Sequence, residues 1–250
     1  MSTPPQTHFD QNQLPAELKN VTMRKSVTSS ITSTSTYEST QDESSLVNTT
    51  ELYKIPLFRI NPSFGIVNVA NKDIKLQPMT IKERRDVGAN VNIVFAVRTP
   101  GCGGCREHAV QLAELAKTDK KISVVAAVKE TGVDDEALME FYEDYFHHPI
   151  YKDAEWKIFR AMGGKKVSPF TILKRGASLF RRTKTKGIES KVTSGVDFWT
   201  KGGVLIFNRK GELKYTQYER FGKEFDMEAI RDAIQDIRAE QKHTGHSQHM

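Results

Sequence analysis

The chain has 250 residues, a formal net charge of +6 and 38% hydrophobic residues. This length allows one domain, or one domain with a tail, and the low hydrophobic content predicts that part of the chain lies outside a packed core. No run of about 18 apolar residues is present, so we expect no transmembrane helix.

The first 50 residues predict a disordered tail. Fifteen of the 25 residues from Ser26 to Thr50 are serine or threonine, and such a segment buries too little apolar surface to offset the entropy of ordering it. The tail is either an inert extension or a phosphorylated regulatory segment. The first residues have neither the basic nor the apolar region of a secretory signal, so we expect a reducing, cytoplasmic setting.

The next segment, residues 51–240, predicts one α/β domain. Short strands at 56–60 and 65–69 and a polar helical turn at 81–87 come first. The runs Val91–Val97 and Ile122–Val128 are apolar and β-branched, which is typical of buried strands. Apolar spacing and acidic caps predict helices at residues 102–117, 134–146, 154–162 and 227–237. Residues 203–218 predict a hairpin with Gly211 in its turn, and residues 241–250 predict a second disordered tail.

The order of these elements predicts a thioredoxin-like fold. Two parallel strands joined by a right-handed crossover, followed by an antiparallel hairpin, form a central mixed sheet flanked by helices. In such sheets ligands bind at the carboxyl ends of the parallel strands. Two loops reach that edge, Arg98–Gly101 and Lys129–Glu130.

Both cysteines of the chain lie in one Cys-Gly-Gly-Cys tetrapeptide between the first buried strand and the helix that follows it. A CxxC in this position is typical of a redox-active dithiol. Cys102, at the helix start, is the predicted nucleophile, because the helix dipole and the nearby Arg98 and Arg106 favour its thiolate. Glu107 acts against the thiolate. Cys105 is predicted to be more buried and to act as the resolving thiol.

Two glycines separate the cysteines, and we expect them to leave the sulfurs accessible and to let a partner approach. A buried structural CxxC is the first alternative. A zinc site that recruits Cys102, Cys105 and His108 is the second, although a fourth ligand is not evident. A phosphate-binding loop is excluded, because no Lys-Ser or Lys-Thr follows the glycines.

A basic insert over about residues 165–200 carries the charge excess. Nine lysines and arginines lie between Lys165 and Lys191, against Glu189 alone. We expect an irregular, solvated loop with a few residues packed on the core; peripheral contact with a membrane surface or an anionic partner is the other interpretation. No nucleic-acid-binding motif is present.

Several motifs resemble the peroxiredoxin-like 2 family, a branch of the alkyl hydroperoxide reductase and thiol-specific antioxidant superfamily. The resemblance runs from about residue 88 to 237 and rests most strongly on the Arg-x-Pro-Gly-Cys-x-x-Cys-Arg-Glu stretch at 98–107. Supporting matches are Val125–Glu130, Ile150–Asp153 and Gly202–Ile206.

This resemblance implies a thioredoxin-like antioxidant oxidoreductase whose redox pair is Cys102 and Cys105. It also implies a peroxide, endoperoxide or disulfide substrate, no bound cofactor, and recycling by an external thiol such as thioredoxin or glutathione, with NADPH used indirectly. Supporting site residues are expected at Arg98, Thr99, Pro100, Arg106, Lys129, Glu130, Gly202 and Gly203.

Three departures accompany the resemblance, and the first is that the tryptophan typical of thioredoxin before the motif is missing. Gly202-Gly203 stands where thioredoxin has its cis-proline, and the Pro-x-x-x-Thr-x-x-Cys signature of peroxiredoxins proper is missing. The rival prediction is a non-catalytic thioredoxin-fold module that binds an anionic partner or membrane through the basic insert.

Overall fold

The computed structural model describes residues 47–60, 79–80, 89–129, 135–191 and 195–246. All of them belong to the second of two units into which the chain divides, Thr40–Met250. Several predicted features lie outside the described residues: the tail up to residue 46, the strand at 65–69, the helical turn at 81–87, Glu130, and the last four residues of the C-terminal tail.

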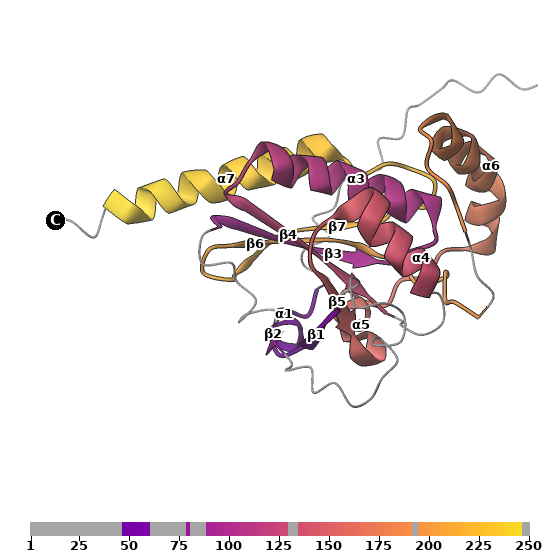
Figure 1. Ribbon diagram of the computed structural model, residues 1–250. Coiled ribbons are helices and arrows are strands. Elements are labelled where there is room, and N and C mark those ends of the chain that lie inside the picture. The colour runs from indigo at the N-terminus through magenta and orange to yellow at the C-terminus, as the bar shows by residue number, and fades with distance from the viewer. Residues whose placement is uncertain (1–46, 61–78, 81–88, 130–134, 192–194, 247–250) are drawn as a thin grey trace, which may run out of the picture. The chain divides into compact units, whose positions relative to one another are not determined.

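A seven-stranded mixed sheet forms the centre of this unit in the described part of the chain (Figure 1). The strands are β1 (Pro56–Ile60), β2 (Met79–Thr80), β3 (Val91–Val97), β4 (Ile122–Val128), β5 (Ile150–Asp153), β6 (Gly203–Asn208) and β7 (Leu213–Tyr218). Their order is β2-β1-β5-β4-β3-β6-β7. The central strands β3, β4 and β5 are parallel, and the remaining pairings are antiparallel.

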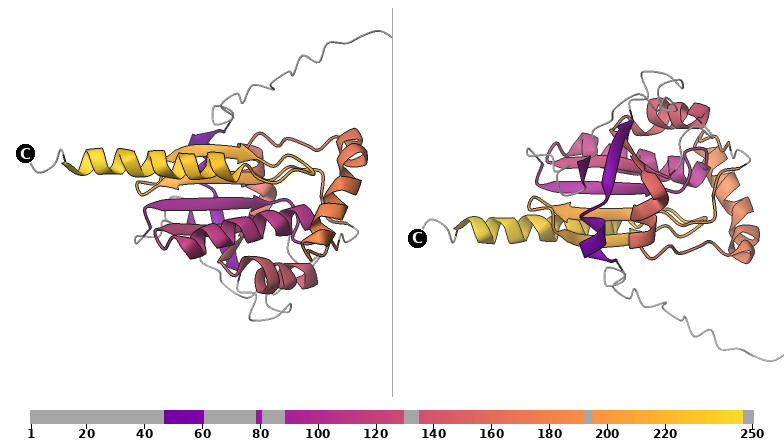
Figure 2. Two further views of the ribbon diagram at one scale, coloured as in Figure 1. Left: turned by 90° about the horizontal axis from the view of Figure 1, so that it is seen from above. Right: turned by 90° about the horizontal axis from the view of Figure 1, so that it is seen from below.

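Helices cover both faces of the sheet. They are α1 (Thr49–Leu52), α3 (Gly103–Thr118), α4 (Asp135–Glu140), the π-helical turn η4 (Phe141–Phe146), the 3-10 turn η5 (Ala154–Trp156), α5 (Lys157–Ala161), α6 (Pro169–Thr185) and α7 (Met227–His246). Figures 1 and 2 show α3, α4 and α7 on one face, and α1 and α5 on the other. Among the described residues, no helix has the length and apolar character needed to cross a membrane.

Successive side chains of β3 contribute alternately to the two hydrophobic clusters, one on each face of the sheet. Ile93 and Phe95 point to the face that packs against α3 and α7, while Val94 and Ala96 join the cluster under α1 and α5. Alternate residues of a strand point to opposite faces, so a continuous apolar run is buried on both sides. β3 is therefore a central strand, and its carboxyl end, where the cysteine loop begins, is fixed by packing on both faces.

Most predicted elements are confirmed. Strands β3 and β4 have the predicted bounds, and the hairpin turn has Gly211 at φ 82°, in the left-handed region that favours glycine. The predicted apolar stripe of α7 is buried at Ile230, Ile234 and Ile237. The C-terminal tail was predicted to begin too early, because α7 continues to His246.

Two elements differ from the prediction. β5 is a third parallel strand beside β4; its four residues are too few to show a clear strand periodicity, so the sequence pattern missed it. α6 is a helix of 17 residues where a solvated loop was predicted. Pro169 at its first turn suits a helix start, but several of its large apolar side chains face outward, so no single buried stripe marks the helix.

Candidate active site

The cysteine pair lies where β3 passes into α3. The strand ends at Val97, and α3 begins at Gly103 with Cys102 as its N-cap residue. The Cys102 carbonyl accepts the first helical hydrogen bond, from the Arg106 amide at 3.0 Å. The Cys102 side chain makes no capping hydrogen bond, but its N-cap position places it near the positive end of the helix dipole, which favours a thiolate.

Arg98 is the cation that contacts the first cysteine. Its Nη2 atom donates to the Cys102 sulfur at 2.8 Å and lies 2.9 Å from Oε1 of Glu219. The Arg98 side chain is almost fully buried, and Nη1 donates to the Phe198 carbonyl at 3.2 Å. A buried guanidinium that is held by a carboxylate and a carbonyl keeps a fixed direction, so its charge is aimed at the sulfur.

The pKa values of the two thiols are shifted in opposite directions. A hydrogen bond from Cys105 is the largest effect on Cys102; burial opposes it and the Arg98 charge adds to it, and the pKa of Cys102 falls to about 6. The same hydrogen bond, together with burial, raises the pKa of Cys105 well above its usual value. The geometry therefore provides one ionised thiolate and one protonated thiol.

Helix α6 and the segment after it cover the pair. Cys102 is 7% exposed and Cys105 1%. The Gly103 amide donates to Ser190 Oγ at 3.2 Å, and a Cβ atom on Gly103 would lie 3.3 Å from both Ser190 and Thr183. The expectation that the glycines leave the sulfurs open was wrong: they let the cover approach closely.

A cavity of about 270 Å³ nevertheless reaches Cys102. Arg98, Thr99, Cys102 and Gly103 belong to its lining. Its walls are mostly apolar and come from α6 and from loops further along the chain: Ile172, Gly176, Leu179, Phe180, Thr183, Ser190, Phe198 and Phe221. A molecule in this cavity would meet the Cys102 thiolate in a largely apolar setting.

Arg106 does not act on the thiolate as predicted. Its Nε donates to the Pro100 carbonyl at 2.9 Å, and its Nη2 pairs with Glu140 at the same distance. The guanidinium also lies over the ring of Tyr145. Arg106 therefore fixes the turn before Cys102 and ties α3 to α4, which is a positioning role.

The Glu107 carboxylate also binds residues other than the cysteines. Arg182 donates to both of its carboxylate oxygens, and Lys186 lies 2.8 Å from one of them. Burial opposes ionisation of Glu107, but these hydrogen bonds outweigh it and lower its pKa. Glu107 thus anchors α6 onto α3, and its charge is compensated by cations of α6.

Lys129 supports the site from the next loop. Its Nζ atom donates to the Asp197 carbonyl at 2.6 Å and to the Asp197 carboxylate at 3.0 Å. Asp197 in turn accepts from Thr200 Oγ1 at 2.6 Å. This contact holds the segment whose next residue, Phe198, supplies the carbonyl bound by Arg98.

The glycine pair expected at the cis-proline position is needed for space. A Cβ atom on Gly202 would lie 2.1 Å from the Ala96 carbonyl oxygen, and one on Gly203 would lie 2.5 Å from the Gln217 oxygen. Real Cβ contacts are never this short, so only glycine fits. The Gly202 amide donates to Glu219 at 3.3 Å, and its carbonyl accepts from the Glu219 amide.

His108 is a buried core residue. One ring nitrogen, Nε2, lies 3.1 Å from the Lys223 carbonyl, so it donates a proton there. The ring stacks on Phe225 with centroids 3.8 Å apart, and burial lowers its pKa. The His108 ring is therefore held in the core by Phe225 and the Lys223 carbonyl, while its buried Nδ1 atom has no hydrogen-bond partner.

Glu219 is the site residue that sequence reasoning missed. It follows β7 directly and is 3% exposed. The strand registers contain a signal, because Gly203 pairs with both Ala96 and Tyr218. That register places residue 219 beside residue 202 and near the start of the cysteine loop.

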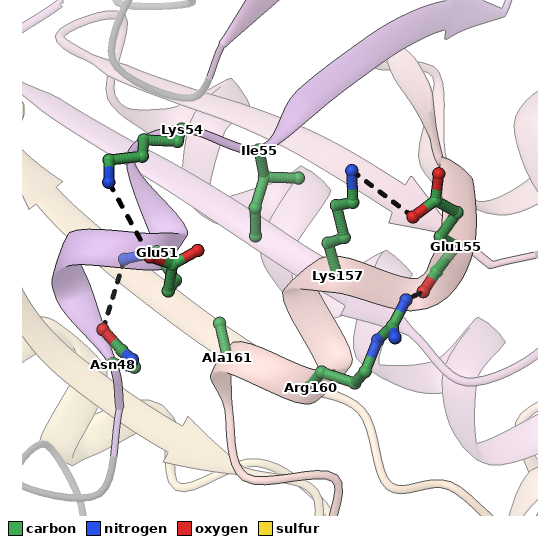
Figure 3. Close-up of a pocket in the computed structure, with 8 residues that line it drawn as sticks. All are labelled: Asn48, Glu51, Lys54, Ile55, Glu155, Lys157, Arg160 and Ala161. Carbon is green, nitrogen blue, oxygen red and sulfur yellow. Dashed lines mark hydrogen bonds and ion pairs between the residues drawn. The ribbon is translucent and has the colours of Figure 1, made fainter.

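A second cavity of about 410 Å³ lies between α1 and α5 (Figure 3). Its charged residues pair with each other: Lys54 lies 3.7 Å from Glu51, and Lys157 lies 3.4 Å from Glu155. Its lining contains no thiol or hydroxyl group. Of these two cavities, the one at Cys102 contains the thiol needed for nucleophilic chemistry.

Comparison with known proteins finds similarity to antioxidant enzymes and to peroxiredoxin-like proteins. A family model described as AhpC/TSA antioxidant enzyme matches residues 109–220. Peroxiredoxin-like 2A of Xenopus tropicalis is 26% identical over 170 residues, which cover 66% of this chain and 73% of that protein. Peroxiredoxin-like 2A of Rattus norvegicus is 28% identical over 171 residues, covering 67% and 72%. The chain is thus similar to peroxiredoxin-like proteins, and its central mixed sheet flanked by helices has the predicted thioredoxin-like arrangement.

Solved structures give a weaker likeness. A peroxiredoxin-like protein from Aquifex aeolicus is 11% identical, with a TM-score of 0.45 over 73% of this chain and 83% of that one. Peroxiredoxin Q from Xanthomonas campestris is 11% identical, with a TM-score of 0.45 over 76% and 93%. The family model that matches is described as an antioxidant enzyme, and its matched residues begin after Cys105.

Proposed function

We propose that the chain is a thiol oxidoreductase in which Cys102 attacks a peroxide-type or disulfide substrate and Cys105 resolves the product. The observation that carries this proposal is the 2.8 Å contact from Arg98 to the Cys102 sulfur in the lining of a largely apolar cavity. The lowered pKa of Cys102, about 6, supports the role of nucleophile, because the thiolate is the reactive form. The raised pKa of Cys105 supports the role of a thiol that stays protonated until the second step.

With an organic hydroperoxide, the Cys102 thiolate attacks the terminal oxygen, which carries the hydrogen. An S–O bond forms, the O–O bond breaks, and the leaving alkoxide takes a proton from water. The substrate is reduced to an alcohol and Cys102 is oxidised to a sulfenic acid. The Cys105 sulfur then attacks the Cys102 sulfur, and the departing hydroxide combines with the Cys105 proton as water.

With a disulfide, the Cys102 thiolate displaces one thiolate from the substrate and forms a mixed disulfide. Cys105 then displaces the second thiolate, which takes the Cys105 proton. Both routes end in the same Cys102–Cys105 disulfide, which an external thiol reduces with two electrons. Cysteines at i and i+3 of a helix start are close enough to form this bond after a small adjustment.

The cover over the pair favours a small, apolar peroxide over a protein disulfide. Cys102 is reached through a cavity of about 270 Å³ whose walls include Leu179, Phe198 and Phe221. A volume of this size suits a small molecule, at the low end of ligand cavities. A folded protein substrate would require α6 to move away.

The same geometry bears on the reductant. A small thiol such as glutathione can approach Cys102 through the cavity, whereas a thioredoxin-type protein needs the segment around Ser190 to open. NADPH would then supply electrons indirectly, by keeping either thiol reduced.

The experiment is a reduction panel with the full chain. Hydrogen peroxide, an apolar organic hydroperoxide, an endoperoxide and insulin disulfide are offered with glutathione or with thioredoxin and its NADPH-dependent reductase. We expect the apolar hydroperoxide to turn over fastest. Cys102→Ser is expected to abolish turnover, whereas Cys105→Ser is expected to accumulate the mixed disulfide with glutathione. Undiminished turnover in Cys102→Ser would overturn the proposal.

A further inference from the structure

One side of α6 is apolar and turned outward. Phe170, Leu173 and Phe180 are exposed at 71%, 82% and 61%, and they are half of the large exposed hydrophobic residues in the described part of the chain. The opposite side of the helix packs inward through Leu179 and Thr183. Single exposed apolar residues are ordinary, but three on one face of a helix mark an interaction surface.

Cations accompany this face. At 3.6 residues per turn, Leu173, Phe180 and Lys184 share one stripe, and Phe170, Lys174 and Arg181 share the adjacent one. Lys174, Arg181 and Lys184 are exposed, and none of them has a carboxylate partner among the described residues. We call the six residues of these two stripes the α6 face.

Two neighbouring cations are used within the protein, Arg182 of α6 and Lys186, the C-cap residue of the helix. Arg182 and Lys186 bind Glu107 and Glu224. No acidic residue lies within α6. The free cations of the α6 face therefore are not needed to hold the helix, and their charge is directed to solvent.

The α6 face adjoins the cavity at Cys102. Phe180 is exposed on that face and also lines the cavity, together with Gly176 and Leu179. Whatever covers the face therefore lies next to the wall of the cavity. An apolar surface there would continue the apolar lining of the cavity outward.

We propose that the α6 face docks on an anionic lipid surface. Phenylalanine and leucine insert at the boundary of the acyl chains, while lysine and arginine reach the phosphate and carboxylate groups of the lipids. A second copy of the chain fits less well, because residues 165–191 carry nine cations against one acid and two such faces repel each other. The charge complementarity thus favours anionic lipid as the occupant.

Docking would bring the Cys102 cavity to the membrane surface. An apolar peroxide that forms in the lipid phase could then reach the thiolate without crossing much water. This consequence rests on the proposed function, whereas the docking itself does not.

The test is co-sedimentation of the full, reduced chain with lipid vesicles. One set contains phosphatidylcholine alone, and the other contains roughly one-third phosphatidylserine. We expect binding to the anionic vesicles only, and we expect it to weaken as salt rises because the attraction is screened. The triple variant Lys174→Gln/Arg181→Gln/Lys184→Gln should bind about a hundredfold more weakly, from about fivefold per cation.

Matched control variants distinguish vesicle binding by the α6 face from a general effect of positive charge. Phe170→Ser/Leu173→Ser should lower binding by at least about tenfold, whereas Val110→Ser, on the exposed side of α3, should not. Lys117→Gln/Lys120→Gln/Lys121→Gln removes three exposed cations elsewhere and should lose less than the α6 triple variant. Wild-type protein that stays in the supernatant, equal binding to neutral vesicles, or equal loss in the control variants would each overturn the proposal.

A final arm keeps the two proposals distinct. Cys102→Ser should bind anionic vesicles as the wild type does. If it does so while the reduction panel fails, the docking stands and the proposed chemistry falls. If the panel succeeds but vesicle binding is absent, the docking alone is wrong.

Discussion

The Nη2 atom of Arg98 lies 2.8 Å from the Sγ atom of Cys102, within a buried part of the domain. The same nitrogen contacts Glu219 at 2.9 Å, so the arginine is shared between a buried acid and the thiol. Glu219 holds the guanidinium in place, but its negative charge also raises the pKa of Cys102. The acidity of the thiol is therefore a balance between these two side chains.

Glu219→Gln should lower the pKa of Cys102 below about 6, because it removes a negative charge near the thiolate. Arg98→Met should move that pKa in the other direction. The measurement is the pH at which Cys102 reaches half its maximal rate of alkylation in each variant. If the pKa of Cys102 shifted in the same direction in both variants, Arg98 and Glu219 would not act on the thiol in opposite directions.

The stability of these variants should also differ. Arg98→Met leaves the Glu219 carboxylate buried without its cation, which should lower the free energy of unfolding by about 3–5 kcal/mol. The double variant Arg98→Met/Glu219→Gln removes both charges and should recover much of that loss. Denaturant unfolding of the three variants checks this order.

Gly103→Ala and Gly104→Ala should have different effects on stability. A Cβ atom on Gly104 finds ordinary contact with Leu179 at 3.4 Å, so alanine there should stabilise the helix by about 0.5–1 kcal/mol. A Cβ atom on Gly103 meets Ser190 and Thr183 at 3.3 Å and presses on the cover. The free energy of unfolding of Gly103→Ala should therefore be about 1–2 kcal/mol lower than that of Gly104→Ala. Equal free energies of unfolding would contradict the close approach of α6.

The lowered pKa of Asp197 should make the stability of the protein depend on pH. Burial opposes its ionisation, but hydrogen bonds from Thr200 and Lys129 outweigh burial and lower its pKa to about 2. A depressed carboxylate pKa contributes stability that is present above the unfolded value near 4 and lost as pH falls through about 2. Because the group is partly exposed, Asp197→Asn should cost about 1 kcal/mol at pH 7.

The pH series is the informative part of that measurement. The difference in free energy of unfolding between wild type and Asp197→Asn should shrink from pH 5 to pH 2. A difference that stays constant over this range would mean that the ionised carboxylate is not what anchors the loop.

Sequence patterns sufficed for the elements that carry a local signal. β3 and β4 are continuous β-branched runs, and α7 repeats isoleucine at helical spacing, so burial could be inferred without tertiary contacts. The position of Cys102 at a helix start followed from the same patterns. β5 and α6 were missed because four residues carry little periodicity, and because α6 turns Phe170, Leu173 and Phe180 to the outside.

The site required contacts between distant parts of the chain. Arg106 is close to Cys102 in sequence, yet its guanidinium binds Pro100 and Glu140, which no spacing rule predicts. Glu219 reaches Arg98 across the sheet register. Which of the two arginines, Arg98 or Arg106, contacts the Cys102 thiol is thus set by the positions of the carboxylates of Glu219 and Glu140.

The pH profile of Cys102 alkylation tests the central claim most directly. Iodoacetamide is small enough for the cavity, and mass spectrometry of the peptides distinguishes Cys102 from Cys105. We predict that Cys102 is modified first, with a rate that rises through pH 6 and levels off above it, while Cys105 stays unmodified. Half-maximal modification of Cys102 near its ordinary pKa of about 8.5, or earlier modification of Cys105, would contradict the assignment of Cys102 as the nucleophile.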